Sequence, residues 1–148
     1  PAAREMCSAR AGGGAFLDGR RLKVAAGEKT LDRAFLVTGF PYNVRQPGVA
    51  QRNLGRFEKF LTGSFAVRRD GSAAYDLACV AAGRFDGFWE ENLSHWDTAA
   101  GCLMVREAGG IITDFDGAEF DQSSSKTVLA AAGGKLHGQM LEVLQQAD

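Results

Sequence analysis

Apolar residues fall into two kinds of segment that alternate along the chain from residue 34 onward. Short apolar runs closed by turn residues are typical of buried strands, and they occur at 34–38, 65–68, 85–90, 111–115 and 128–132. Segments with apolar residues three or four positions apart are typical of helices, and they occur at 47–62, 72–83, 97–108 and 135–146. Alternating strands and helices predict an α/β fold, in which a mainly parallel or mixed sheet has helices on its faces.

The ends of the expected helices carry residues that suit those positions. Pro47 suits a helix start, Ser72 is a good N-cap and Gly83 is a natural C-cap. Asp97 is expected to cap the third helix, which ends before Gly109. The apolar face of the first helix is expected to consist of Val49, Leu54, Phe57, Phe60 and Leu61.

A β-hairpin is expected ahead of this alternation. Asp18-Gly19 joins two apolar-bearing runs, and its two residues suit a turn with positive φ, which predicts a hairpin over 15–24. The glycines at 12–14 are expected to form a flexible turn and not a phosphate cradle. We therefore divide the chain into a hairpin segment of a truncated, incomplete N-terminal sheet at 1–30 and a layered helix–sheet–helix lobe at 31–148.

The composition narrows the class of protein. The length of 148 residues fits one domain or one lobe, and a net charge of -1 gives no reason to expect nucleic acid or a membrane surface as partner. No apolar run approaches the ~20 residues of a membrane span, and no leader segment is expected at the start. Three cysteines without a CxxC pair predict reduced thiols and a cytoplasmic location.

Candidate polar residues gather at one predicted edge of the sheet. Glu90 ends a strand and Asp97 begins a helix, so both are expected at the strand carboxyl ends, where α/β sheets bind ligands. Asp97 has two compatible readings, because one carboxylate oxygen can cap the helix while the other binds Mg²⁺. Glu91 is expected to be a solvated loop charge. Gly71, Ser72 and Ala73 open a helix, whose start is either an ordinary N-cap or a site for phosphate or sugar hydroxyls.

Other familiar chemistries find no support in the sequence. His95 and His137 have no partner at zinc-ligand spacing, and His95 is expected to be structural. Neither a G-x-S-x-G elbow nor a P-loop nor a G-x-G-x-x-G segment occurs. The basic pair at 68–69 is expected to be solvated.

Four segments taken together resemble the inositol monophosphatase family, and they read GSAAYDL at 71–77, FDGFWE at 85–90, WDTAAG at 96–101 and EAGG at 107–110. The last two match the C-terminal signature of that family, and AGGGAFLDGR at 11–20 is similar to its mid-chain hairpin. The resemblance implies the C-terminal lobe of the inositol monophosphatase fold and Mg²⁺-dependent hydrolysis of a phosphomonoester, with inositol monophosphate as the leading substrate.

The resemblance also implies roles for particular residues. Asp97 matches a metal ligand that lies close to the substrate, and Glu90 matches a residue that hydrogen-bonds inositol hydroxyls. The helix start at Gly71, Ser72 and Ala73 matches a segment that lines the substrate site. No residue of this chain matches the catalytic threonine of the family.

The chain departs from the family pattern in what it lacks. The other metal ligands of the family lie in more N-terminal segments, one of them an Asp-Pro-x-Asp-Gly-Thr motif, and neither segment occurs here. Mg²⁺ needs several anchored oxygen ligands, so we expect the 148 residues alone to be inactive and a longer parent protein to be active. The start at Pro1 fits truncation or processing. An incomplete sheet predicts association with the missing N-terminal half or a homodimer.

Two alternatives remain open at this point. The first is a related sugar, histidinol or nucleotide phosphatase of the same superfamily. The second is a non-catalytic binding module that keeps the fold without a complete metal site.

Overall fold

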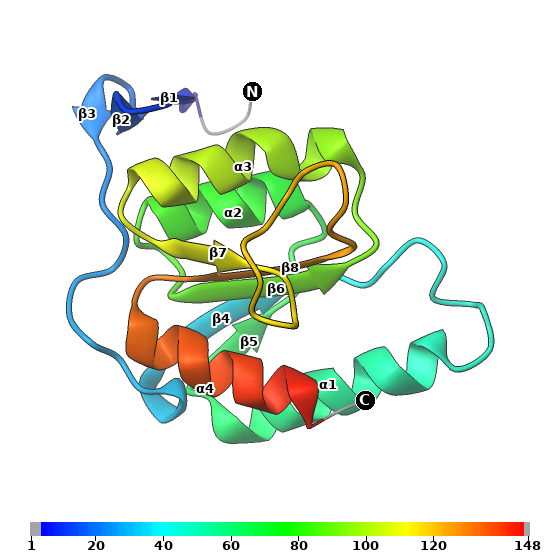
Figure 1. Cartoon of the computed structure of the whole chain (residues 1–148). Coiled ribbons are helices and arrows are strands. Elements are labelled where there is room, and N and C mark those ends of the chain that lie inside the picture. Colours follow the sequence, from blue (N-terminus) through cyan, green and yellow to red (C-terminus); the bar gives the residue numbers. More distant parts are fainter. Residues whose placement is uncertain (1–3, 147–148) are drawn as a thin grey trace.

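The computed structural model describes residues 4–146, which form two sheets and four α-helices (Figure 1). The larger sheet has five strands in the order β5-β4-β6-β8-β7. These strands are β4 (Phe35–Thr38), β5 (Ala66–Arg68), β6 (Gly87–Glu91), β7 (Ile111–Thr113) and β8 (Thr127–Ala131). In Figure 1, α2 (Ala73–Ala81) and α3 (His95–Glu107) cover one face of it, while α1 (Val49–Gly63) and α4 (Gly134–Gln145) cover the other.

The directions of the strands confirm the prediction of a mixed sheet. The central strand β4 is parallel to both of its neighbours, β5 and β6. Strand β8 is antiparallel to β6 and to β7. The carboxyl ends of β5, β4 and β6 therefore lie side by side, and the segments that follow these three strands meet at one edge of the sheet.

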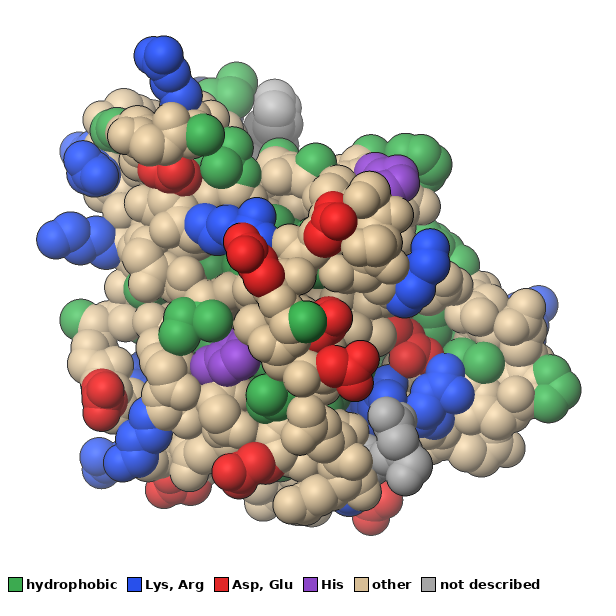
Figure 2. Space-filling model, viewed as in Figure 1, with side chains coloured by type: hydrophobic (Ala, Val, Ile, Leu, Met, Phe, Trp, Pro, Cys, Tyr) green, Lys and Arg blue, Asp and Glu red, His purple; other side chains and the backbone are tan. Residues whose placement is uncertain are grey.

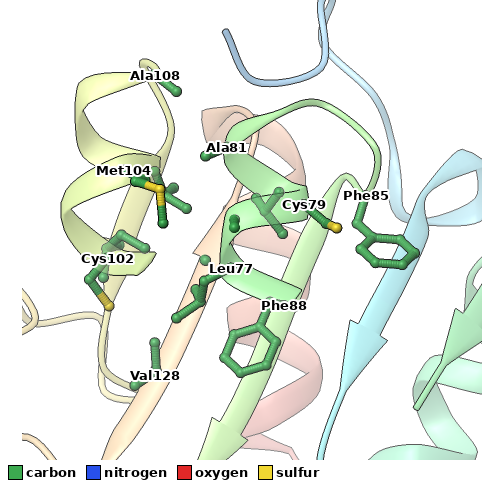
Figure 3. Close-up of a cluster of buried hydrophobic side chains, with 14 of the residues drawn as sticks. Leu77, Cys79, Ala81, Phe85, Phe88, Cys102, Met104, Ala108 and Val128 are labelled. Atoms are coloured by element: carbon green, nitrogen blue, oxygen red, sulfur yellow. The ribbon is translucent and has the colours of Figure 1, made fainter. Parts of the chain in front are cut away.

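Each face of the larger sheet has its own apolar core, because alternate residues of a strand point to opposite faces. Phe88 lies in the cluster beneath α2 and α3, where Figure 3 shows Leu77 next to it. The next residue, Trp89, lies in the cluster beneath α1 and α4, where its ring is 4.0 Å from that of Phe60. Strand β6 is buried on both faces, which explains why the adjacent residues Phe88 and Trp89 are both apolar instead of alternating with polar residues.

Helices α2 and α3 pack closely at Gly101. A Cβ placed on Gly101 would lie 2.5 Å from Cβ of Leu77, a distance that real Cβ atoms do not adopt. We expect Gly101→Ala to lower the free energy of unfolding by about 1–3 kcal/mol, measured by urea denaturation, because the helices must move apart. Gly138→Ala is the matched control in α4, where a Cβ meets open space, and it should gain up to about 1 kcal/mol from helix propensity. Equal effects of the two substitutions would contradict close packing at Gly101.

The hairpin prediction is confirmed and extended. Strands β2 (Gly14–Leu17) and β3 (Arg20–Arg21) pair across Asp18 and Gly19, whose φ values of 50° and 78° are both positive. A further strand that the sequence pattern did not reveal, β1 (Cys7–Arg10), pairs with β2. The three strands form a separate sheet that packs on α3. The division of the chain at residue 30 stays a prediction.

The glycine turn between β1 and β2 holds a carboxylate of the chain itself. Glu107 at the end of α3 accepts hydrogen bonds from the N–H groups of Gly12 at 2.6 Å and Gly14 at 2.7 Å. These bonds lower the pKa of Glu107 and tie the smaller sheet to α3. The N–H of Gly13 donates to the carbonyl oxygen of Arg10, so all three amides of the glycine turn are bound within the fold.

Two predictions about helices are wrong. Helix α3 begins at His95, with Ser94 as the N-cap, so Asp97 lies inside the first turn and is not the N-cap residue. In α1, Leu54 and Leu61 are each more than half exposed, while Asn53 and Arg56 are buried in their place. The reason is an ion-pair network beneath α1, which also overturns the prediction for Glu91.

Glu91 is buried at the end of β6 and is not a solvated loop charge. One oxygen of its carboxylate accepts hydrogen bonds from Arg52 and Asn53, and the other accepts one from Arg56, each at 2.8 Å. Burial alone would raise the pKa of Glu91, but these hydrogen bonds outweigh it and lower the pKa. The network fixes α1 against the sheet.

The described surface gives two further findings. No helix within residues 4–146 has both the length and the apolar character that crossing a bilayer requires. On the face drawn in Figure 2, basic and acidic side chains both occur among apolar and neutral ones, in keeping with a net charge of -1.

Candidate functional site

A cavity of about 510 Å³ lies at the edge where β4, β5 and β6 end. Its walls come from the segments after β4 and β5, the start of α2, strand β6 and the first turn of α3. All five residues predicted for the site line it, and these are Gly71, Ser72, Ala73, Glu90 and Asp97. The topology thus brings together residues from three separate sequence segments, as their positions at strand and helix ends predicted.

Glu90 forms part of the floor of this cavity. Its side chain is on the same face of β6 as Phe88, toward α2 and α3, and it is buried. Burial, together with the nearby charges of Asp76 and Asp97, raises the pKa of Glu90 to about 7, and Arg69 opposes this shift. Among residues 4–146 the Glu90 carboxyl group forms no ion pair, and it is therefore available to bind polar groups of a ligand.

Asp76 is a buried acidic residue that the sequence analysis missed. It lies on α2 with no exposed surface, and neither of its carboxylate oxygens has a hydrogen-bond partner among the described residues. Burial raises its pKa to about 7, together with the charge of Asp70. A signal was present in the sequence, because position 76 lies on the same helical face as Ala73 and Val80, which are both apolar.

Asp97 holds the start of α3, although not from the N-cap position that was predicted, and its role as a metal ligand stays a prediction. The backbone N–H of Ser94 donates to its Oδ2 at 3.1 Å, and the backbone N–H of Asp97 donates back to Ser94 O at 3.0 Å. The first of these bonds belongs to a capping box, in which the side chains of Ser94 and Asp97 each accept the backbone N–H of the other residue. No donor within residues 4–146 binds the other oxygen, Oδ1, so one oxygen holds the helix start and one remains for a ligand.

The start of α2 leaves backbone donors for the cavity. Ser72 is the N-cap residue, as predicted, but its side chain makes no capping hydrogen bond. Gly71, with φ of 85°, directs the chain into the helix in a conformation that residues with side chains rarely adopt. The first N–H groups of a helix attract anions, so this end of the cavity suits a phosphate or a hydroxyl group.

Two arginines also line the cavity, although Arg69 is expected from the sequence to be a solvated charge. Arg45 and Arg69 both line the cavity. The guanidinium of Arg69 lies 5.9 Å from the ring centre of Phe40, and its Nη1 would be 3.7 Å from a Cβ on Gly71. The neighbouring Arg68 instead lies over the ring of Phe35, at 5.3 Å, and does not line the cavity.

Neither histidine belongs to this cavity. His95 lies in a smaller neighbouring hollow of about 200 Å³, where Gln122 is 3.3 Å from its Nδ1. His137 is hydrogen-bonded to Thr113 at 2.8 Å, and burial lowers its pKa. Both residues therefore have local roles.

Comparison with known proteins identifies the family. The family model described as "Inositol monophosphatase family" matches residues 1–148. The chain belongs to the inositol monophosphatase family. It is 45% identical to inositol-1-monophosphatase of Caulobacter vibrioides over 150 residues, which cover 99% of this chain and 56% of that protein. It is 48% identical to Nus factor SuhB of Pseudomonas aeruginosa over 117 residues, which cover 79% of this chain and 43% of that protein.

Solved inositol monophosphatases have the same fold. The structure of inositol monophosphatase from Anabaena (Nostoc) sp. matches with a TM-score of 0.87 and 38% identity, covering 96% of this chain and 54% of that one. The chain spans about half the length of the curated relatives it matches. The layered α/β lobe with its separate small sheet is therefore the inositol monophosphatase fold, as the sequence resemblance predicted.

Three of the four segments that resemble the inositol monophosphatase family contribute residues to the cavity. The WDTAAG segment forms the first turns of α3 and places Asp97 in the wall of the cavity. The EAGG segment begins with Glu107, the last residue of α3, whose carboxylate binds the glycine turn. The GSAAYDL segment forms the start of α2, and FDGFWE runs into β6. One family signature thus contains both a cavity residue and a residue that stabilises the fold.

The described residues fit a metal ion only in part. Carboxylate oxygens are ligands that Mg²⁺ prefers, and Asp97 has one available oxygen facing no other donor. However, residues 4–146 contain no group of three or more His, Cys, Asp or Glu side chains able to hold a metal ion. Asp97 can therefore supply one ligand position, and further ligands must come from other residues.

Proposed function

We propose that this chain forms one part of the active site of a Mg²⁺-dependent phosphatase that hydrolyses inositol monophosphate. The observation that carries the proposal is that one cavity is lined by the Asp97 and Glu90 carboxylates and by the start of α2. Membership of the inositol monophosphatase family supports a phosphatase. The name of the Caulobacter relative supports inositol monophosphate as the substrate.

In this proposal, different residues of the chain bind the metal ion, the phosphate and the inositol ring. When bound, Mg²⁺ supplies an activated water and stabilises the charge that develops on the phosphate oxygens. Asp97 contributes Oδ1 as one ligand, and the Ser94 N–H on Oδ2 holds the carboxylate in a fixed orientation. The first N–H groups of α2 and the guanidinium of Arg69 attract the phosphate dianion. Glu90 accepts hydrogen bonds from ring hydroxyls at the floor.

The remaining metal ligands are proposed to lie outside this chain. They belong either to an N-terminal half of the same protein or to an associated polypeptide, including a homodimer partner. The proposal places the enzyme in the cytoplasm, because Cys7, Cys79 and Cys102 are all free thiols. Nucleic acid and membrane surfaces are not among its proposed partners.

Phosphate release by the protein translated from the whole reading frame tests this function. We expect Mg²⁺-dependent turnover, with inositol monophosphate preferred over histidinol phosphate and sugar phosphates. Equal or better turnover of histidinol phosphate would show that the inositol assignment is wrong.

Glu90→Gln tests the part of the proposal that concerns the substrate ring. At pH 8, above the Glu90 pKa of about 7, we expect KM for inositol monophosphate to rise about tenfold, because a hydrogen bond to a charged acceptor is worth about 1.5–3 kcal/mol. KM for phenyl phosphate, which has no ring hydroxyls, should change little. Glu119→Gln, at an exposed residue outside the cavity, is the matched control and should leave both values unchanged. An equal rise in KM for both substrates would show that Glu90 does not bind the hydroxyl groups of the inositol ring.

The arginines favour a second candidate within the same superfamily. Arg45 and Arg69 line the cavity together, and two cations there would suit a sugar or nucleotide substrate with a second anionic group. Comparison of a bisphosphate with its monophosphate decides between the candidates. The sugar or nucleotide phosphatase would be favoured if kcat/KM is higher for the bisphosphate than for inositol monophosphate. The kcat/KM for the bisphosphate should then fall in Arg69→Gln but not in Arg68→Gln.

A non-catalytic binding module is the other alternative. Several relatives carry the name Nus factor SuhB, which states no reaction. The upstream reading frame decides the matter. An in-frame Asp-Pro-x-Asp-Gly-Thr segment there supports the phosphatase, whereas its absence, together with no phosphate release, supports the module.

A further inference from the structure

The Glu90 carboxylate lies in space that exists only because residue 39 is glycine. A Cβ built on Gly39 would lie 2.3 Å from both Oε1 and Oε2 of Glu90 and 2.4 Å from its Cδ. Real Cβ atoms essentially never approach another heavy atom within 3.0 Å. Gly39 is also buried and lines the cavity, so the contact is part of its floor.

The pairing of β4 with β6 explains why these two residues meet. Thr38 is the register partner of Trp89, and the Thr38 hydroxyl donates to the carbonyl oxygen of Trp89 at 2.5 Å. The next residues along each parallel strand are Gly39 and Glu90. The position of Gly39 relative to Glu90 is therefore fixed by backbone register and by a buried hydrogen bond.

Strand alternation places both residues toward the same helices. Val37 and Phe88 belong to the core cluster beneath α2 and α3, and positions 39 and 90 each lie two residues further along. A side chain at position 39 would therefore point to the same side of the sheet as the Glu90 side chain. Nothing in the backbone requires glycine here, because Gly39 is not among the glycines with positive φ.

The surroundings limit where the Glu90 carboxylate could go if it were displaced. On the side of α2 lies the buried carboxylate of Asp76, and on the side of α3 lies Asp97; both act on Glu90 as like charges. A displaced carboxylate must therefore swing into the cavity or toward another acid. Either movement changes which ligand atoms it can reach.

We propose that Gly39 is a positioning residue of the substrate site, because the absence of a side chain at this position leaves the space that the Glu90 carboxylate occupies at the floor of the cavity. The inference rests on the proposed function, in which Glu90 accepts hydrogen bonds from substrate hydroxyls. Gly39 itself contacts no reacting atom in this scheme. It determines specificity through Glu90 alone, so its effect depends on the side chain present at position 90.

The first test is kinetic and uses the full-length protein. We expect Gly39→Ala to raise KM for inositol monophosphate about tenfold, as Glu90→Gln does, while kcat changes less than about threefold. KM for phenyl phosphate should stay the same. Gly133→Ala is the matched control, because that glycine has φ of -159° and open space around its Cβ position. If Gly39→Ala leaves KM for the polyol ester unchanged, or raises it equally for phenyl phosphate, the proposal is wrong.

The second test separates positioning from a general structural role. Glu90→Asp shortens the side chain by one methylene and Glu90→Ala removes the carboxylate, so both should relieve the contact with a side chain at position 39. We expect Gly39→Ala to lower the thermal-unfolding midpoint of the wild-type protein but to have little effect in the Glu90→Ala background. We also expect the KM penalty of Gly39→Ala to be smaller in the Glu90→Asp background. Equal penalties in all backgrounds overturn the proposal.

The two tests also distinguish failure of the inference from failure of the proposed function. If the protein prefers a different phosphomonoester, the inositol assignment is wrong, and the same KM comparison is made with the preferred ester. If no phosphoester is hydrolysed, the thermal cycle still decides whether Gly39 and Glu90 are coupled. Absence of coupling in that cycle contradicts the inference whatever the substrate.

Discussion

Replacing Asp97 with Asn should reduce Mg²⁺-dependent phosphate release by about 100-fold or more. Loss of residues that merely orient metal ligands costs about 10–100-fold in affinity or activity, so loss of a ligand itself should cost at least as much. An amide oxygen is a weaker ligand for Mg²⁺ than a carboxylate, because Mg²⁺ prefers hard anionic oxygen. The measurement is turnover of inositol monophosphate by the full-length protein as Mg²⁺ is titrated, and part of the loss should be recovered at high Mg²⁺.

The same substitution leaves the helix start nearly intact, which makes the experiment specific. The side-chain oxygen of Asn can still accept the Ser94 N–H that now binds Oδ2, so the unfolding midpoint should change little. Glu119→Gln removes one negative charge at an exposed position outside the cavity and should not affect Mg²⁺ dependence. Near-normal turnover of Asp97→Asn would show that Asp97 stabilises the helix start and is not a metal ligand.

The sequence predicts the site through topology more than through local pattern. Glu90 and Asp97 are separated by six residues, yet both were placed at one edge because a strand ends at the first and a helix begins near the second. Three neighbours were not predicted. Arg69 and Gly39 line the cavity because of how the segments after β5 and β4 pack, which leaves no periodic trace in the sequence, whereas Asp76 does leave one on the apolar face of α2.

Helix α1 shows why the prediction of a buried face failed. Its buried residues Val49, Asn53, Arg56 and Phe60 follow helical spacing, but the middle two are polar. A search for apolar residues at helical spacing cannot find polar residues that are buried by ion pairing. It therefore predicts that Leu54 and Leu61 are buried, although both are exposed. The start of α3 is different, because a usable signal was present. Ser94 precedes Asp97 by three residues, which is the spacing of a capping box.

The polar stripe on α1 makes Glu91 the residue whose neutralisation should cost the most stability. We expect Glu91→Gln to lower the free energy of unfolding by about 3 kcal/mol, because breaking a buried ion pair leaves the other charge without its counterpart. Arg56, whose side chain is 4% exposed, loses the carboxylate that it contacts at 2.8 Å. Urea denaturation at pH 7 measures the effect. Glu58→Gln, at an exposed position on α1, is the matched control and should change stability by less than about 0.5 kcal/mol.

The pH dependence of that stability difference tests whether charge is the cause. The pKa of Glu91 is lower in the folded protein than in the unfolded chain, so ionised Glu91 contributes stability above the unfolded pKa of about 4.3. This contribution is lost as the pH falls through the lower pKa of the folded state. The gap between the wild-type protein and Glu91→Gln should therefore be constant from about pH 7 to 5 and narrow below about pH 4. A gap that persists unchanged into acid would mean that Glu91 stabilises α1 by packing and not by its charge.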